Sequence, residues 1–193
     1  VRLRIDAVGV PIERPIATIR ATVVGASQYT VQLSGTTIYI DPEDSVPLRN
    51  VPVIAPEFDF SGPDIDPDQI QSAIGIALTR LDLVDRDIAV ALGFRWKGSA
   101  SFMRLEQFGQ GVAAGLKSRI AASRPLVLVS DGDIGGLIGI HLREEMKLNA
   151  PVISIDGIEL KEFDYIDVGQ IVPLSGAVPV VIKSLVFPAS VTA

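Results

Sequence analysis

The sequence predicts an α/β protein with mixed sheets that contain parallel strand-helix-strand crossovers. Two observations lead to this prediction. Between residues 70 and 155, apolar residues alternate between helical spacing and short β-branched runs, which is the strand, helix, strand order of right-handed parallel crossovers. The chain also has 193 residues, of which 48% are hydrophobic, enough to bury a substantial core as one domain or two small lobes.

The N-terminal part is predicted to be rich in β-structure. Residues 18–24, 29–33 and 36–40 are short runs of Val, Ile, Thr and Tyr, separated by Gly and Ser. Such runs are typical of strands with turns between them. We therefore expect three strands in a tight meander.

A proline-rich stretch follows and predicts a boundary. Prolines recur across 41–67, where 51–54 is the one expected strand. We expect that strand at a sheet edge, because Pro52 cannot donate a hydrogen bond to a ladder. The predicted division is a β-rich segment, 1–56, and a C-terminal α/β domain, 57–193.

An amphipathic helix is predicted directly after this stretch. Asp66 is suited to the N-cap and Pro67 to the first helical position. The apolar positions that follow have helical spacing: Ile70, Ala73, Ile74, Ala77, Leu78 and Leu81.

The rest of the chain continues the alternation. Buried-type strands are predicted at 88–92, 125–130 and 151–155, with helices at 102–120 and 134–147 between them. Two further strands, at 165–172 and 178–187, are predicted to close the chain on either side of a Ser-Gly turn.

Composition excludes several classes of function. The net charge of -6 and the scattered Lys and Arg argue against a nucleic-acid partner or an anionic membrane surface. No apolar run approaches the length of a membrane span. The absence of cysteine removes disulfides, thiolate nucleophiles and sulfur-ligated metals. Because the sequence starts with Val1, we expect it to begin inside a longer protein.

A polar, glycine-rich turn after the 125–130 strand is the most suggestive local element. Its backbone N–H groups at Gly132 and Gly135 could meet a phosphate. Asp131 and Asp133 would repel an anion but could bind hydrated Mg²⁺. The structural alternative is that one aspartate caps the next helix and that the Gly135-Gly136 pair allows close packing on the sheet.

Three other features are weaker candidates, and no residue is assigned a catalytic role. His141 has no nucleophile signature near it, which favours a structural role. Trp96 could anchor a partner protein or pack over the second helix. An acidic group near Tyr165 could supply paired carboxylates for acid/base chemistry or simply form a solvated hairpin end: Glu159, Glu162, Asp164 and Asp167.

Four stretches occur in the order found in a known family: TIRATVVGASQYTVQLSGTTIYI, VPLRNVPVI, PLVLVSDGDIGGLIG and DYIDVGQIVPLSGAVPVVIKSLVFP. Through them the chain resembles the C-terminal half of the EutA family, the reactivating factors of adenosylcobalamin-dependent ethanolamine ammonia-lyase. The resemblance implies part of an actin-like (ribonuclease H-like) ATPase fold plus a C-terminal α/β region. Residues 1–56 would then be a remnant of the nucleotide-binding lobe.

The resemblance also implies a division of binding sites. Gly25, Ala26 and Ser27 would form the adenosine turn. The Asp-x-Gly-x-x-Thr phosphate loops of the superfamily are absent from this sequence, so we do not expect the chain alone to hydrolyse ATP. ATP and Mg²⁺ would bind the full-length protein, and cobalamin would belong to the partner lyase.

The function implied by the resemblance is chaperone-like. A reactivase would use ATP to release damaged cobalamin from the lyase so that intact adenosylcobalamin can bind, in the cytoplasm or at an ethanolamine-utilization microcompartment. Homodimerisation stays open. The alternatives are a self-contained α/β enzyme domain that binds a small ligand or Mg²⁺ at the 130–136 turn, and a purely structural interaction domain.

Overall fold

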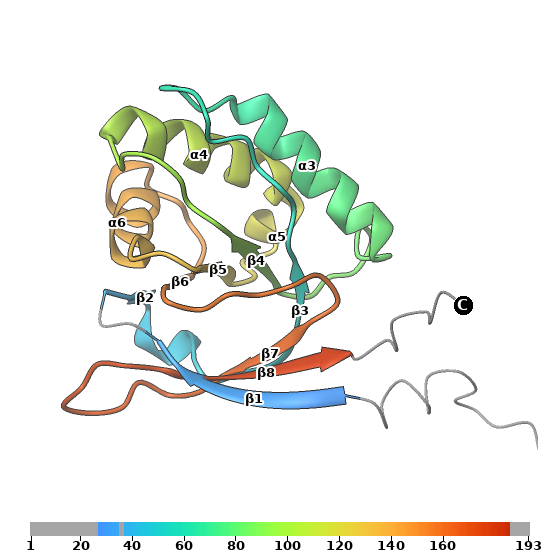
Figure 1. Ribbon diagram of the computed structural model, residues 1–193, viewed down its shortest axis with the longest axis vertical. Coiled ribbons are helices and arrows are strands. Elements are labelled where there is room, and N and C mark those ends of the chain that lie inside the picture. The colour runs from blue at the N-terminus through green and yellow to red at the C-terminus, as the bar shows by residue number, and fades with distance from the viewer. Residues whose placement is uncertain (1–26, 35–36, 186–193) are drawn as a thin grey trace, which may run out of the picture. The chain divides into compact units, whose positions relative to one another are not determined.

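An eight-stranded mixed sheet organises the residues that this computed structural model describes, 27–34 and 37–185 (Figure 1). The predicted α/β class is confirmed. The strands lie in the order β1-β8-β7-β3-β4-β5-β6-β2. Their bounds are β1 Ser27–Leu33, β2 Tyr39–Asp41, β3 Leu48–Ile54, β4 Val90–Phe94, β5 Leu126–Ser130, β6 Val152–Ile155, β7 Tyr165–Val168 and β8 Pro179–Leu185.

The helices fall where the periodicity predicted them, with two irregularities. Their bounds are α3 Pro67–Arg80, α4 Phe102–Gly115, α5 Lys117–Ala121 and α6 Gly135–Ile140, with a 3-10 turn at Glu43–Ser45. The predicted 102–120 helix is interrupted at Leu116, whose buried side chain belongs to the core. The predicted 134–147 helix changes after α6 into a π-helical turn, His141–Glu145.

Helix α3 shows why the sequence signal was clear. The Asp66 side chain accepts a hydrogen bond from the backbone N–H of Asp68 at 2.9 Å, and Pro67 occupies the first position. Every apolar side chain that α3 buries comes from one face: Ile70, Ile74, Ala77 and Leu78. Capping and periodicity therefore agree with tertiary burial.

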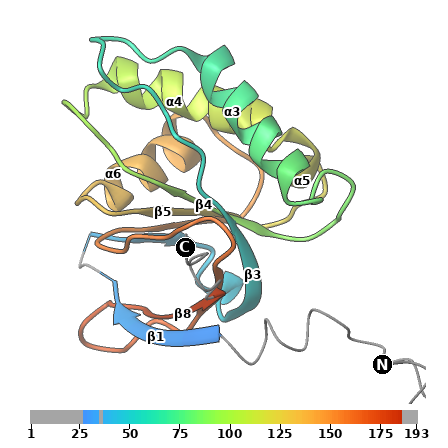
Figure 2. The same cartoon turned by 45° about the vertical axis from the view of Figure 1, so that its right-hand side comes forward.

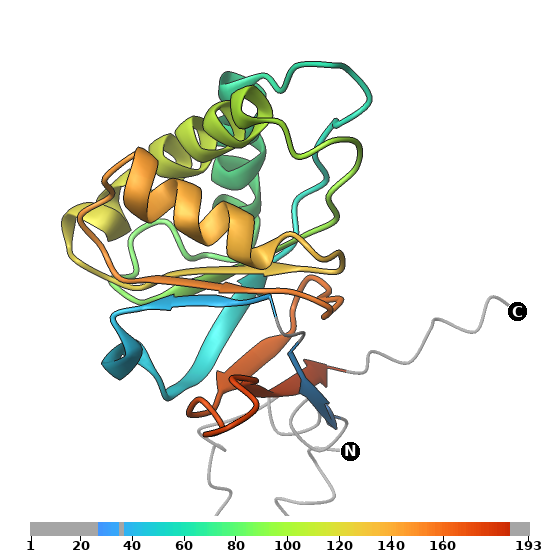
Figure 3. The same ribbon diagram turned by 90° about the vertical axis from the view of Figure 1, so that its left-hand side faces the viewer.

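The parallel crossovers are also confirmed. β3 pairs in parallel with β4, β4 with β5, and β5 with β6. The connecting helices α3, α4 and α6 lie on one face of these strands (Figure 3). Phe108 of α4 is fully buried and packs in the same apolar cluster as Leu92 and Leu128 of the sheet.

The sheet curls so that its other face is covered by strands. β3 pairs in parallel with β4 on one side and antiparallel with β7 on the other, and β7 continues antiparallel to β8. Figure 2 shows β3 running from the layer of β4 and β5 toward that of β8 and β1. A second apolar cluster joins the two layers through residues such as Val127, Ile153, Ile166 and Val180.

The predicted N-terminal meander is wrong. β1 lies beside β8, whereas β2 pairs antiparallel with β6, so they occupy opposite ends of the strand order. The β-branched pattern identified strands at 29–33 and near 36–40, but their partners come from the far end of the sequence. Ile40 pairs with Ile153, for example. The predicted strand at 18–24 lies outside the described residues.

The predicted edge position of the 51–54 strand is also wrong, because β3 is an interior strand. Pro52 pairs with Tyr165 of β7 close to a register irregularity, the kind of place where a strand tolerates a missing N–H. The next residue, Val53, donates its N–H to the Asp164 carbonyl at 2.9 Å. Burial of the last four residues of β3 on both faces accounts for its interior place.

Residues Gln28–Ser184 form one compact unit. Strands from both sides of residue 56 share its sheet. The assignment of 1–56 to a nucleotide-binding lobe and 57–193 to a separate domain stays a prediction. Within the described residues, no helix has the length and apolar character needed to cross a bilayer.

Candidate functional site

Polar side chains gather where the parallel strands end. The carboxyl ends of β3, β4 and β5 surround a cavity of about 500 Å³, within the size range of small-ligand sites. In open α/β sheets, ligands bind beyond this end of the strands. The charged residues that line the cavity are Glu57, Arg95, Lys97, Asp131 and Glu159.

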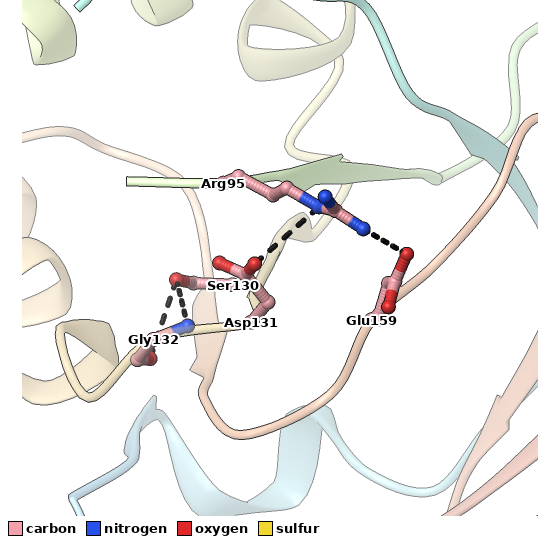
Figure 4. A network of polar contacts seen from close by, with 5 residues as sticks. All are labelled: Arg95, Ser130, Asp131, Gly132 and Glu159. Carbon is pink, nitrogen blue, oxygen red and sulfur yellow. Dashed lines mark hydrogen bonds and ion pairs between the residues drawn. The ribbon is translucent and has the colours of Figure 1, made fainter. Parts of the chain in front are cut away.

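Arg95 connects two of the carboxylates at this cavity (Figure 4). Its Nε lies 3.4 Å from Oδ2 of Asp131, and its Nη2 forms an ion pair with Glu159. The Ser130 hydroxyl oxygen accepts a hydrogen bond from the Gly132 N–H at 3.1 Å. Arg95 therefore holds the end of β5 to the segment after β6, and the turn at Gly132 is held by its own strand.

The two aspartates of the glycine-rich turn have different partners. Asp131 faces Arg95, whereas Asp133 accepts a hydrogen bond from the Thr37 hydroxyl, just before β2. In the described residues no three His, Cys, Asp or Glu side chains gather in an arrangement that could hold a metal. Metal binding by Asp131 together with Asp133 stays a prediction.

Asp156, directly after β6, is the site residue that sequence reasoning missed. It is 1% exposed, and neither carboxylate oxygen has a hydrogen-bond partner among the described residues. Burial raises the pKa of Asp156; the nearby Thr37 hydroxyl and Gly135 N–H oppose this rise, and Asp133 adds to it. The available signal was the Asp-Gly pair after an apolar strand, which occurs at 131–132 and again at 156–157.

The glycines of the turn allow close packing, as the structural alternative predicted. A Cβ added to Gly135 would lie 3.1 Å from the backbone of Ile155, and one added to Gly136 would lie 3.1 Å from the Thr37 carbonyl oxygen. The capping part of that alternative is wrong, because the N-cap of α6 is Ile134 and no side chain caps it. Phosphate binding at Gly132 and Gly135 stays a prediction.

The proposed adenosine turn cannot be placed in the fold. Gly25 and Ala26 lie outside the described residues, and Ser27 is described only as the first residue of β1. Nucleotide binding at these three positions therefore stays a prediction.

His141 and Trp96 have structural surroundings. His141 is 4% exposed, its Nε2 lies 2.8 Å from Oε2 of Glu106, and its ring packs on Phe102. The Trp96 ring packs edge-on to Phe108, with centroids 5.6 Å apart. The favoured structural interpretation of His141 and the packing of Trp96 over the second helix are both supported.

The acidic group near Tyr165 is divided among separate partners. Glu159 pairs with Arg95 and Glu162 with Arg80. Asp164 accepts the Lys161 N–H, and Asp167 meets Lys183. Each of these four carboxylates therefore has its own structural contact.

Comparisons with known proteins identify relatives along nearly the whole chain. Residues 4–188 match the family model described as "Ethanolamine utilisation protein EutA". The chain is 34% identical over 179 residues to "Ethanolamine ammonia-lyase reactivase EutA" of Salmonella typhimurium and 33% identical to the Escherichia coli protein of the same description. Each match covers 92% of this chain but 36% of the relative. No solved structure matches.

Proposed function

Since the chain belongs to the EutA family of ethanolamine utilisation proteins, we propose that it is part of a reactivase of ethanolamine ammonia-lyase. The observation that carries this proposal is the 34% identity to the Salmonella reactivase across 92% of the chain. The chain spans 36% of the length of the relatives it matches. We therefore propose the reactivase activity for the whole protein and a supporting part of it for this chain.

The proposed reaction is a release and exchange of cofactor. The whole protein would use ATP and Mg²⁺ to open a lyase that holds damaged cobalamin, so that intact adenosylcobalamin can replace it. Such a factor acts by binding the open lyase better than the closed one, since a binding partner shifts an equilibrium only through differential affinity. Cobalamin chemistry would remain with the lyase.

This chain would supply a rigid contact or support domain. The superfamily's Asp-x-Gly-x-x-Thr phosphate loops are absent from the sequence, and phosphoryl transfer needs several such elements to position phosphates and Mg²⁺. We accordingly expect no ATP hydrolysis by the chain alone. A curled sheet with an apolar core on each face suits a rigid part that connects the ATP-binding region of the whole protein to the lyase.

A paired reactivation assay tests the proposal. Ethanolamine ammonia-lyase inactivated with cyanocobalamin is mixed with ATP, Mg²⁺ and adenosylcobalamin, and with the full-length parent, the parent lacking these 193 residues, or the 193-residue chain. We expect lyase activity to return with the intact parent and with neither truncated form. As a control, a known reactivase is added to the same inactivated lyase. If the known reactivase restores activity and the intact parent does not, the proposal is contradicted.

The cavity at Arg95 and Asp131 supports a second candidate, an α/β domain that binds a small polar ligand at the 130–136 turn. Its volume of about 500 Å³ and its mixed charges are the specific observations in favour. Under this candidate, Asp131→Ala would abolish binding of a ligand found by screening small metabolites against the chain. The same substitution in the full-length parent would leave lyase reactivation intact.

A further inference from the structure

Three oxygen-bearing side chains meet beside the carboxyl ends of β5 and β6. Asp133 follows β5, Asp156 follows β6, and Thr37 comes from the segment that leads into β2. The Thr37 hydroxyl donates to Asp133. The Thr37 hydroxyl, the Asp133 carboxylate and the Gly135 N–H also lie close enough to Asp156 to shift its pKa, although none of these contacts meets the full geometry of a hydrogen bond. The result is a buried carboxylate beneath a hydroxyl and a second carboxylate at the surface.

Neither carboxylate is neutralised by a basic side chain. The ion pairs formed within the described part of the chain include neither Asp133 nor Asp156. Arg95, which follows the neighbouring strand β4, is shared between Asp131 and Glu159. Burying an ionised carboxylate without a partner costs several kcal/mol, so Asp156 requires either a proton or a cation.

The geometry favours a cation over a proton. A proton would satisfy one oxygen of Asp156, whereas both oxygens are buried and without a hydrogen-bond partner. A cation can bind both oxygens, directly or through its waters. Carboxylate and hydroxyl oxygens are also the hard ligands that Mg²⁺ and Ca²⁺ take, and Mg²⁺ usually needs only one or two protein carboxylates because it keeps several waters.

We propose that Asp156, Asp133 and the Thr37 hydroxyl hold a hard divalent cation of the Mg²⁺ or Ca²⁺ class. This inference concerns the chain itself and does not rest on the proposed reactivase function. It differs from the pairing of Asp131 with Asp133 suggested by the sequence, since Asp156 replaces Asp131.

The surrounding backbone holds the three groups in place. The Gly136 N–H donates to the Thr37 carbonyl oxygen at 2.6 Å, which fixes the hydroxyl-bearing residue against the start of α6. Gly135 lies against the backbone of Ile155 and Asp156, where a Cβ would come within 3.2 Å of both Asp156 N and Cβ. Close backbone packing thus brings residues from three segments together, and their arrangement does not depend on long flexible side chains.

Cation binding by the 193-residue chain tests the proposal. After treatment with chelator and removal of the chelator, Mg²⁺, Ca²⁺ or Mn²⁺ is added while binding is followed by titration calorimetry and stability by thermal unfolding. We expect saturable binding near one ion per chain and an unfolding midpoint several degrees higher with the ion, because a ligand that binds only the folded state stabilises it.

Three isosteric variants locate the site. Asp156→Asn and Asp133→Asn should each weaken binding at least tenfold and remove the rise in unfolding midpoint, whereas Asp131→Asn should retain both. Circular dichroism without added ion confirms that each variant is folded. Absence of cation binding by the unsubstituted 193-residue chain would overturn the proposal, and so would equally tight binding by Asp156→Asn. A midpoint that rises on acidification and ignores every cation would assign a shared proton to the two carboxylates and would also overturn it.

Discussion

Two buried aspartates, one directly before β7 and one directly after β6, make a direct comparison. Asp164 lies just before β7, is 4% exposed and accepts the Lys161 N–H at 2.8 Å, while its own N–H donates to the Lys161 carbonyl. Asp156 lies just after β6, is 1% exposed and has no hydrogen-bond partner for either oxygen among the described residues. The two side chains share chemistry and burial but differ in what satisfies them.

The difference separates a structural carboxylate from a candidate ligand. Buried polar groups in native proteins are nearly always hydrogen-bonded, and Asp164 follows this rule through its own turn. Asp156 departs from it at the carboxyl end of a parallel strand, where α/β domains bind their ligands. A buried carboxylate that is hydrogen-bonded within the chain, such as Asp164, therefore indicates a role in folding. A buried carboxylate without such a bond, such as Asp156, indicates a partner from outside the chain.

The largest expected effect on stability comes from removing the Asp164 carboxylate, which is hydrogen-bonded within the chain. Asp164→Ala should lower the free energy of unfolding by about 2 kcal/mol, because it leaves the Lys161 N–H without its acceptor and opens a small cavity. Urea denaturation measures the change. Asp164→Asn keeps an acceptor oxygen and should lose less than half as much. Equal losses from both variants would show that the carboxylate charge, rather than the hydrogen bond, stabilises this turn.

A smaller effect is expected where α6 approaches the segment that carries Thr37. Gly139→Ala places a Cβ about 2.3 Å from Cβ of Tyr39, so packing must shift at a cost of about 1–2 kcal/mol. Gly75→Ala is the matched control, since nothing lies within 4 Å of its added Cβ, and it should be neutral or slightly stabilising. Equal behaviour of the two helical glycines in thermal unfolding would contradict the close approach.

A pH profile of stability sharpens the comparison further. Burial raises the pKa of Asp156 in the folded state. The contribution of this group to the free energy of unfolding is therefore fully present below the pKa of the unfolded chain, and it is lost as the pH rises through the pKa of the folded state. Without divalent cations, this one group gives a slope of at most about 1.4 kcal/mol per pH unit. Asp156→Asn should remove that slope, as measured by urea denaturation between pH 4 and 8. An unchanged profile would contradict the raised pKa.

The smallest effect on stability is expected at Asp167, a carboxylate whose pKa is lowered where that of Asp156 is raised. Burial acts to raise the pKa of Asp167, but hydrogen bonds from Lys183 and from the Asn50 N–H outweigh it and hold the pKa below its usual value. The contribution of Asp167 to the free energy of unfolding is present above the pKa of the unfolded chain and is lost as the pH falls through the lower pKa of the folded state. Lys183→Met should cost less than about 1 kcal/mol and should reduce acid sensitivity in the same measurement. A loss as large as that of Asp164→Ala would contradict this ranking.

Local signals in the sequence predicted local structure well. Asp66, Pro67 and the apolar period of α3 all lie within one helix, so the residues that decide it are adjacent in sequence. The parallel strands of the central sheet followed from the same alternation of periods. These elements need no information about distant partners.

Elements decided by distant partners were not predictable in the same way. Pro52 indicated an edge strand, but burial between β4 and β7 gave β3 an interior place. The strand runs near residues 30 and 40 looked like neighbours, yet β2 pairs with β6 more than a hundred residues away. Asp156 belongs to the same class, because only the fold brings it beside Asp133 and Thr37.

The double pairing of β3 has a consequence for how the domain opens. β3 contributes Ile54 to the helix-covered core and Val53 to the core between the strand layers. Neither core can come apart without exposing the other, so the two should melt in one cooperative step. Its interior amides, such as the Val53 N–H, should then exchange with solvent only through global unfolding, as the slowest class in a hydrogen-exchange experiment.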